Sequence, residues 1–173
     1  MNVGIFCGTA GGTSMKIANS LAKSFGVNQD DVINMEDDFD DIEQLLEYDV
    51  LFLGSSTWGQ GDVHHSWVDV LLDIESENID FSGKIVAFYG AGDSVKHKEH
   101  FCSALGKLYD VFVGAGAIPV GMIPKDNYNY QFSLAQKGEM FCGLGIDEHN
   151  EAEKTNQRIE EWIKLLKNEI KEG

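Results

Sequence analysis

Basic residues are scarce in this chain, whose 173 residues include 13 Lys and Arg but 29 Asp and Glu, for a formal net charge of −16. A protein this acidic is repelled by nucleic acids and by anionic membrane surfaces, so we exclude both as partners. Residues 24–83 carry sixteen acids and no Lys or Arg. This asymmetry favours electrostatic steering toward partners with basic patches, although acids that only keep the protein soluble are the alternative.

Cysteine is also rare. Cys7, Cys102 and Cys142 are odd in number, widely spaced and outside any Cys-x-x-Cys pair, which indicates neither a disulfide framework nor a structural zinc site. No apolar stretch approaches the roughly 20 residues of a membrane span, and the chain starts with a strand pattern instead of a charged leader. We therefore expect a cytoplasmic, monomeric protein with one domain over residues 1–173 and no membrane insertion.

Apolar strand patterns alternate with helical patterns along the whole chain. The strand patterns cover Val3–Cys7, Val50–Gly54, Ile85–Tyr89 and Ala117–Met122, with a weaker one at Val32–Met35. The helical patterns are built on Ile17/Leu21/Phe25, Ile42/Leu45/Leu46, Trp67/Val70/Leu71, Phe101/Leu105/Leu108 and Ile159/Trp162/Ile163/Leu166/Ile170. Such alternation predicts an α/β fold with a doubly wound, five-stranded parallel sheet and helices on both faces.

Residues 123–138 interrupt the region of the last strand. This segment contains Pro124, Asp126 and Asn127, followed by the aromatic residues Tyr128, Tyr130 and Phe132. We interpret it as an insertion in the last strand.

A small polar loop, Gly8–Ser14, lies between the first strand pattern and the first helical pattern. Its backbone N–H groups, the hydroxyls of Thr9, Thr13 and Ser14 and the positive end of the following helix predict an anion site. No Lys follows the second glycine and the spacing is not Gly-x-Gly-x-x-Gly, so a single terminal phosphate fits better than ATP or a dinucleotide. Simple capping of the helix is the alternative.

The loop that follows the buried strand at 50–54 contains a large aromatic residue among small ones. Its sequence is Ser55-Ser56-Thr57-Trp58-Gly59-Gln60-Gly61-Asp62. A tryptophan in a glycine-rich loop is better explained by stacking on a flat ligand than by core packing.

The loop after the strand pattern at 85–89 reads Gly90-Ala91-Gly92-Asp93-Ser94, and His97, His100 and Cys102 follow it. Its backbone N–H and C=O groups can recognise the polar edge of a heterocycle. The two histidines have helical spacing, but no third strong ligand accompanies them, so we interpret them as stacking or edge contacts and predict no metal site. In a doubly wound sheet these three loops meet at one edge. Together they predict a planar heterocycle on a short phosphorylated chain, and FMN meets all three requirements.

The chain also resembles the long-chain flavodoxins over essentially its whole length. The family's phosphate loop, T-x-T-G-x-T, corresponds to Thr9-Ala10-Gly11-Gly12-Thr13-Ser14, with Gly11 and Ser14 in place of threonines. The T-W-x-x-G turn corresponds to 57–61, the G-x-G-D loop to 90–93, and the long-chain insertion to the Tyr128 segment before Phe141-Cys142-Gly143-Leu144. This resemblance implies strand order 2-1-3-4-5 and bound FMN. His97 stands where the family usually has a tyrosine stacked on the outer flavin face.

The resemblance implies a low-potential one-electron carrier that shuttles FMN between semiquinone and hydroquinone and replaces or complements ferredoxin. Its expected partners are redox proteins with basic patches, such as ferredoxin-NADP reductase, photosystem I or ferredoxin-dependent enzymes. We expect the acids, with no Lys or Arg nearby, to disfavour the anionic reduced flavin. An FMN-dependent NAD(P)H:quinone reductase-like enzyme is the alternative, but it needs a second pocket open to the flavin. A phosphoryl-accepting receiver is set aside because its Asp at the end of the third strand and its acids after the first strand are missing: those places hold Ser55 and Ser56, and Cys7 and Gly8.

Overall fold

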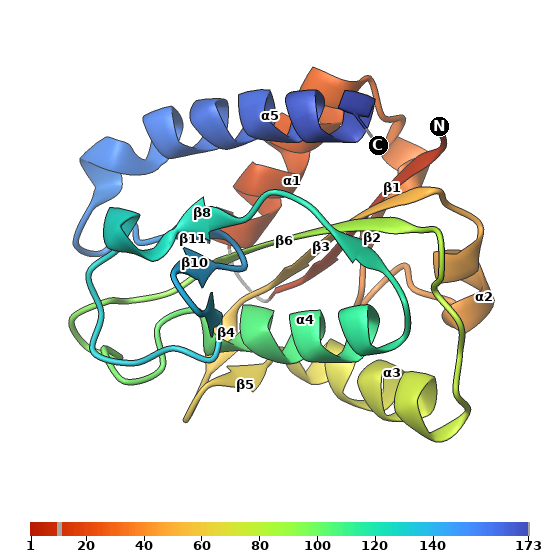
Figure 1. Ribbon diagram of the computed structural model, residues 1–173, viewed down its shortest axis with the longest axis horizontal. Helices are drawn as coiled ribbons and strands as arrows, with labels where there is room; N and C mark the ends of the chain where they lie inside the picture. Colours follow the sequence, from red (N-terminus) through yellow and green to blue (C-terminus); the bar gives the residue numbers. More distant parts are fainter. Residues whose placement is uncertain (10–11, 173) are drawn as a thin grey trace.

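The computed structural model describes residues 1–9 and 12–172, which form a parallel sheet between two layers of helices (Figure 1). The sheet has the order β11-β6-β3-β1-β2. Its strands are β1 (Val3–Gly8), β2 (Val32–Asn34), β3 (Val50–Ser55), β6 (Ile85–Ala91) and β11 (Gly143–Ile146). Because β6 and β11 are the fourth and fifth long strands of this sheet, the predicted order 2-1-3-4-5 is confirmed.

The central strands are apolar on both faces, as a parallel sheet covered on two sides requires. In β1, Phe6 packs into one core cluster, whereas Ile5 and Cys7 pack into the other. The same alternation runs through β3, where Leu51 and Phe52 point to opposite clusters. The sheet therefore separates two hydrophobic cores.

Five α-helices of the described residues cover the sheet, and their apolar stripes determine which face each one takes. α1 (Gly12–Phe25) and α5 (Thr155–Glu172) lie together over one face, where Leu21 and Trp162 are buried. α2 (Ile42–Leu46), α3 (His65–Ser76) and α4 (Ser103–Gly114) supply the core of the other face, which includes Leu45, Trp67 and Phe112. Each predicted helical pattern corresponds to one of these helices, although Phe101 precedes α4.

The edge next to β6 is built from two separate pieces of chain. β7 (Ile118–Pro119) pairs with the start of β6, whereas β11 pairs with its end, where Gly143 lies opposite Phe88. The strand predicted at 117–122 is therefore only two residues long. The rest of that strand position is supplied after the insertion.

The insertion forms a small antiparallel sheet of its own, in the order β8-β10-β9. Its strands are β8 (Ile123–Pro124), β9 (Gln136–Lys137) and β10 (Met140–Phe141), and η2 (Lys125–Asn127) lies within it. Tyr128 anchors the insertion: its ring centroid is 4.5 Å from that of Phe141, and its hydroxyl accepts a hydrogen bond from Gly145 N–H at 3.0 Å. The insertion is thus packed onto the strand that it precedes.

The remaining short elements are β4 (Thr57–Trp58), β5 (Asp62–Val63), η1 (Gln29–Asp31) and η3 (Ala152–Lys154). None of the described helices is both long and apolar enough to cross a bilayer.

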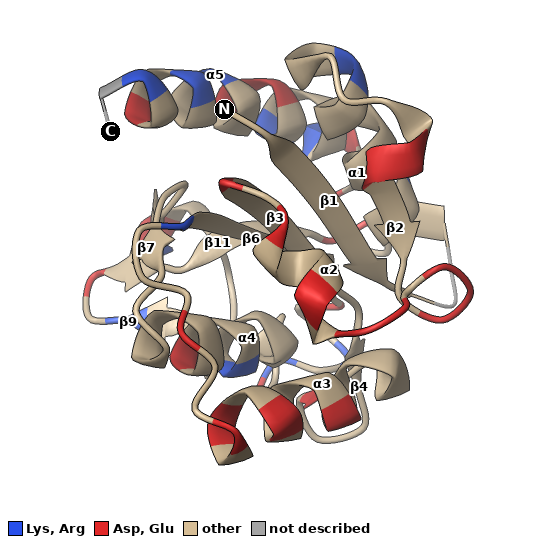
Figure 2. Cartoon of the chain, turned by 90° about the vertical axis from the view of Figure 1, so that its right-hand side faces the viewer, with Lys and Arg blue, Asp and Glu red and all other residues tan. Residues whose placement is uncertain are grey.

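Charge is distributed unevenly over the molecule (Figure 2). Acidic residues crowd α2, α3 and the loop between β2 and α2, whereas α5, on the opposite side of the sheet, carries basic as well as acidic residues. The acidic stretch of the sequence therefore forms one acidic face. We use this name for the surface of residues 36–47 and of α3.

Candidate functional site

A cleft of about 410 Å³ lies at the carboxyl ends of the parallel strands. Residues from all three predicted loops line it, together with the last residue of β11 and residues that follow this strand. The lining residues are Thr13, Ser56, Thr57, Trp58, Gly59, Ala91, Gly92, Asp93, Lys96, His97, Ile146, Glu148 and His149. The strand order explains this convergence, because β1 and β3 end side by side where the chain reverses direction across the sheet.

The first loop presents hydroxyl groups at the start of α1. Thr13 lines the cleft and Thr9 is buried, while Ala10 and Gly11 lie outside the described residues. Ser14 is 1% exposed, and its Oγ has no hydrogen-bond partner among the described residues. A buried hydroxyl without a partner costs free energy, so this atom, at the positive end of α1, is suited to an anionic ligand.

The second loop is a hairpin in which β4 pairs with β5 and places Trp58 opposite Asp62. Trp58 is 51% exposed, and its indole Nε1–H donates to Ser56 Oγ at 2.7 Å. The turn needs glycine, because Gly59 has φ +52°, in the left-handed region that side chains disfavour. The loop therefore holds a large exposed aromatic plate on a short, defined turn.

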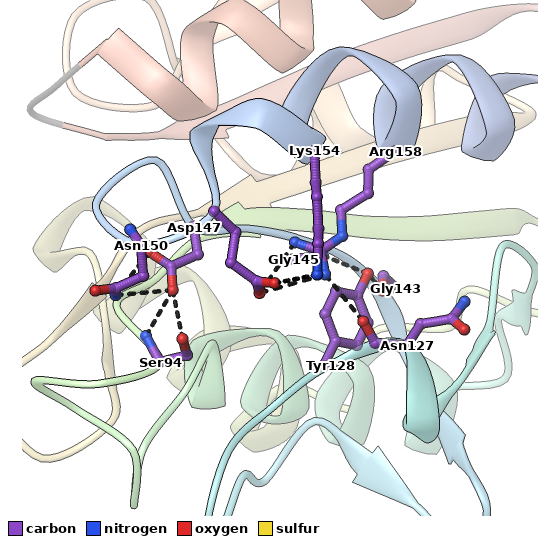
Figure 3. A network of polar contacts seen from close by, with 10 residues as sticks. Ser94, Asn127, Tyr128, Gly143, Gly145, Asp147, Asn150, Lys154 and Arg158 are labelled. Atoms are coloured by element: carbon purple, nitrogen blue, oxygen red, sulfur yellow. Dashed lines mark hydrogen bonds and ion pairs between the residues drawn. The ribbon is translucent and has the colours of Figure 1, made fainter.

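The third loop is fixed to the end of β11 by a network of polar contacts around Asp147 (Figure 3). The fully buried Asp147 carboxylate accepts hydrogen bonds from Ser94 N–H at 3.0 Å and from Asn150 N–H at 3.1 Å. Burial alone would raise the pKa of Asp147, but the hydrogen bonds from Ser94 and Asn150 hold it below its ordinary value. Asn150 also donates to Asp93 Oδ1 at 2.8 Å, so one asparagine joins the two carboxylates.

Not every residue predicted in the site faces the cleft. His100 and Cys102 do not line it, because residues 94–102 form turns and not the helix that the His97/His100 spacing suggested. Cys102 is fully buried behind Gly92, where an added Cβ would lie 2.9 Å from its Sγ. Other predicted residues outside the lining are Thr9, Gly12, Ser14, Gln60, Gly61 and Gly90. Which of the residues contact a ligand stays a prediction.

The contribution of the end of β11 and of the segment after it was not predicted from the sequence. Ile146, Glu148 and His149 line the cleft, and Lys96 does so from the third loop. The signal was available, because every strand of a parallel sheet ends at the same edge, and the last strand is no exception. The expectation that no basic residue lies near the site is wrong, since Lys96 faces the cleft.

Comparison with known proteins agrees with this geometry. The family model for flavodoxin matches residues 5–162. The chain belongs to the flavodoxin family. Flavodoxin 1 of Azotobacter vinelandii is 47% identical over 168 residues, covering 97% of each chain. Flavodoxin 1 of Escherichia coli K12 is 37% identical, covering 96% of this chain and 93% of the relative. The Fusobacterium nucleatum flavodoxin crystallised with flavin mononucleotide superimposes with a TM-score of 0.85 at 30% identity, covering 98% of this chain and 99% of that structure.

Proposed function

We propose that the chain binds FMN in this cleft and carries single electrons between protein partners. Membership of the flavodoxin family makes it an electron-transfer protein and not an enzyme with its own substrate. One observation supports the assignment of FMN to this cleft. Thr13 at the start of α1, the exposed Trp58 and the glycine-rich end of β6 all line the same cavity of about 410 Å³. The flavin supplies the redox chemistry when it is bound.

The phosphate would be held by the first loop. Thr13 lines the cleft, and the unpartnered Oγ of Ser14 lies in the first turn of α1. Backbone N–H groups and the dipole of α1 stabilise a dianion without a cationic side chain.

The isoalloxazine ring would lie between the second and third loops. Trp58 offers an exposed plate on one side, and His97 is the candidate for the other, since both line the cleft. Ala91 and Gly92 bring backbone close to the cavity, and the hydrogen bond from Gly92 N–H to Ile146 O, at 3.0 Å, fixes that backbone to β11. A rigid loop can recognise the polar edge of the ring.

The acidic face would guide the docking of electron-transfer partners. Its acids lie on α2, on α3 and on the loop before α2, and that loop starts at the carboxyl end of β2. Partners with basic patches, ferredoxin-NADP reductase and photosystem I among them, would be attracted to this surface. The quinone reductase-like alternative is not favoured, because both family membership and the two covering rings oppose it.

Titration of the flavin-free protein with FMN and with riboflavin tests this function. We expect one equivalent of FMN to bind and to quench tryptophan fluorescence, while riboflavin, which has no phosphate, binds more weakly. Trp58→Ala should weaken FMN binding by about tenfold or more, in line with the loss of ring stacking and buried area. Phe132→Ala, which removes another exposed aromatic residue, should leave it unchanged. Equal FMN affinity in the Trp58 variant, or equal affinity for riboflavin, would contradict the assignment.

A further inference from the structure

Two histidines and a glutamate meet beside the second loop, outside the cleft lining. Glu36 follows β2, His64 precedes α3, and His65 is the first residue of α3. Glu36 Oε1 lies 3.1 Å from His65 Nε2, and Glu36 Oε2 lies 4.0 Å from His64 Nε2. One potential ligand atom from each of the three residues lies within 4.8 Å of the others. This cluster is formed by segments that are almost thirty residues apart in the chain.

The buried member of the cluster has an unsatisfied nitrogen. The side chain of His64 is 1% exposed, and its Nε2 has no hydrogen-bond partner among the residues that the structure describes. Buried polar atoms without partners are uncommon in native proteins because each one costs free energy. The nitrogen faces the Glu36 carboxylate, at a distance too long for a hydrogen bond.

The other ring nitrogen of His64 is held in place. Its Nδ1 lies 2.7 Å from Ser66 Oγ and 3.3 Å from Ser66 N. In the structure Nδ1 accepts the longer hydrogen bond from Ser66 N–H. In the tautomer that carries its proton on Nδ1, the ring gives up this bond, donates to Ser66 Oγ instead, and leaves the lone pair of Nε2 directed into the cluster. Metal-binding histidines are commonly oriented by a hydrogen bond of this kind from the second ring nitrogen.

We propose that Glu36, His64 and His65 form a binding site for a divalent transition-metal ion, with Zn²⁺ as the ion that fits best. Two imidazole nitrogens and one carboxylate oxygen are a common donor set for Zn²⁺, with water as the fourth ligand. Ligand atoms of a tetrahedral Zn²⁺ site with bonds of 2.0–2.1 Å lie about 3.3 Å apart. The two Glu36–histidine separations, 3.1 and 4.0 Å, lie on either side of this value. The side chains of His65 and Glu36 are 70% and 46% exposed, so small rotations of these side chains can complete the geometry.

The electrostatic surroundings also favour a cation. The positive end of the α3 dipole disfavours a bound cation, but the Glu36 carboxylate favours it. Asp37 and Asp38 follow Glu36 directly, and no Lys or Arg occurs between residues 24 and 83. The ring centroids of His64 and Trp58 lie 6.2 Å apart. Metal binding would therefore change the surroundings of Trp58 in the second loop, although none of the three ligands lines the cleft.

Titration of the purified protein with Zn²⁺ by calorimetry, with any flavin retained, tests the site. We expect one equivalent to bind, and Co²⁺ in its place to give the intense visible absorption of a tetrahedral ion. Glu36→Gln and His65→Ala should each weaken Zn²⁺ binding by at least about tenfold, the size of loss typical of impaired metal sites. Both residues are exposed, so neither variant should disturb folding.

Matched variants separate this site from unspecific binding. Asp126→Asn in η2 removes an exposed charge outside the cluster, and His100→Ala removes a histidine outside it, so both should bind Zn²⁺ as the native protein does. His64→Gln, checked for folding by circular dichroism, should lose the site while keeping an acceptor near the start of α3. No saturable binding at millimolar Zn²⁺, or equal binding in the Glu36 and His65 variants, would overturn the proposal. FMN titration of the same variants shows independently whether the proposed function holds.

Discussion

Replacing Asp147 by Asn should destabilise the protein by removing the acceptor that fixes the third loop. The native carboxylate accepts from the N–H and the hydroxyl of Ser94 and from the backbone and side-chain N–H groups of Asn150. Asparagine keeps one oxygen but turns an NH₂ group toward these donors, so about two buried donors lose their acceptor. At roughly 1–3 kcal/mol for each unsatisfied group, the free energy of unfolding should fall by about 2–4 kcal/mol. For a chain of this length that lowers Tm by about 5–15 °C.

The loss should depend on pH in a definite direction. The folded-state pKa of Asp147 is lowered, so its ionised form stabilises the fold above the unfolded pKa of about 3.9, and this contribution disappears as the pH falls through the lower folded value. Urea unfolding followed by circular dichroism should therefore show a full difference between native and Asp147→Asn proteins near pH 7. The difference should shrink below about pH 4.

An exposed carboxylate provides the control for this experiment. Asp126→Asn in η2 removes the same charge without removing the network, and its effect on unfolding should stay within about 0.5 kcal/mol. FMN affinity should fall in the Asp147 variant only, because Ala91, Gly92 and Asp93 line the cleft in the loop that Asp147 holds. Unchanged stability of Asp147→Asn, or equal losses in both variants, would refute the reasoning.

Three further predictions concern the cleft and the acidic face. Gly59→Val should reduce accumulation of the one-electron-reduced flavin in a reductive titration, because a β-branched side chain at φ +52° strains a turn that lines the cleft by about 1–2 kcal/mol or more. Gly83→Val also has positive φ but lies outside the cleft lining, with open space around it, and should leave the accumulation unchanged. Equal accumulation in the two variants would refute this prediction. His97→Ala should weaken FMN binding in a fluorescence titration, because it removes a ring that lines the cleft; unchanged affinity would reject a stacking role for His97. Association with a basic redox partner, followed by stopped flow, should slow steeply with added salt and on Asp69→Asn in α3 but not on Glu161→Gln in α5; a flat salt response would contradict docking through the acidic face.

Local sequence patterns predict most of the fold. A strand of a parallel sheet is buried on both faces, so its sequence is a continuous apolar run, and such a run predicts the strand directly. The runs at 3–7, 50–54 and 85–89 all became central strands, and Trp58 stands out because a large ring in a glycine-rich turn has no core to enter. The last strand was harder to locate. β7 and β11 both pair with β6 at this position, and the insertion separates them in the chain. Pairing between segments so far apart in the chain produces no pattern among neighbouring residues that would predict it.

The chain alone determined the class of fold, the three loops and the phosphate-and-ring character of the ligand, since hydrophobic period, glycine placement and hydroxyl spacing are properties of neighbouring residues. The tertiary structure decided which side chains lie close together. It brought Glu148 and His149 to the cleft, turned Cys102 into the core and set Glu36 beside His64 and His65. Contacts of this kind depend on how strands order and how helices pack, and the free energy that selects them is summed over the whole molecule.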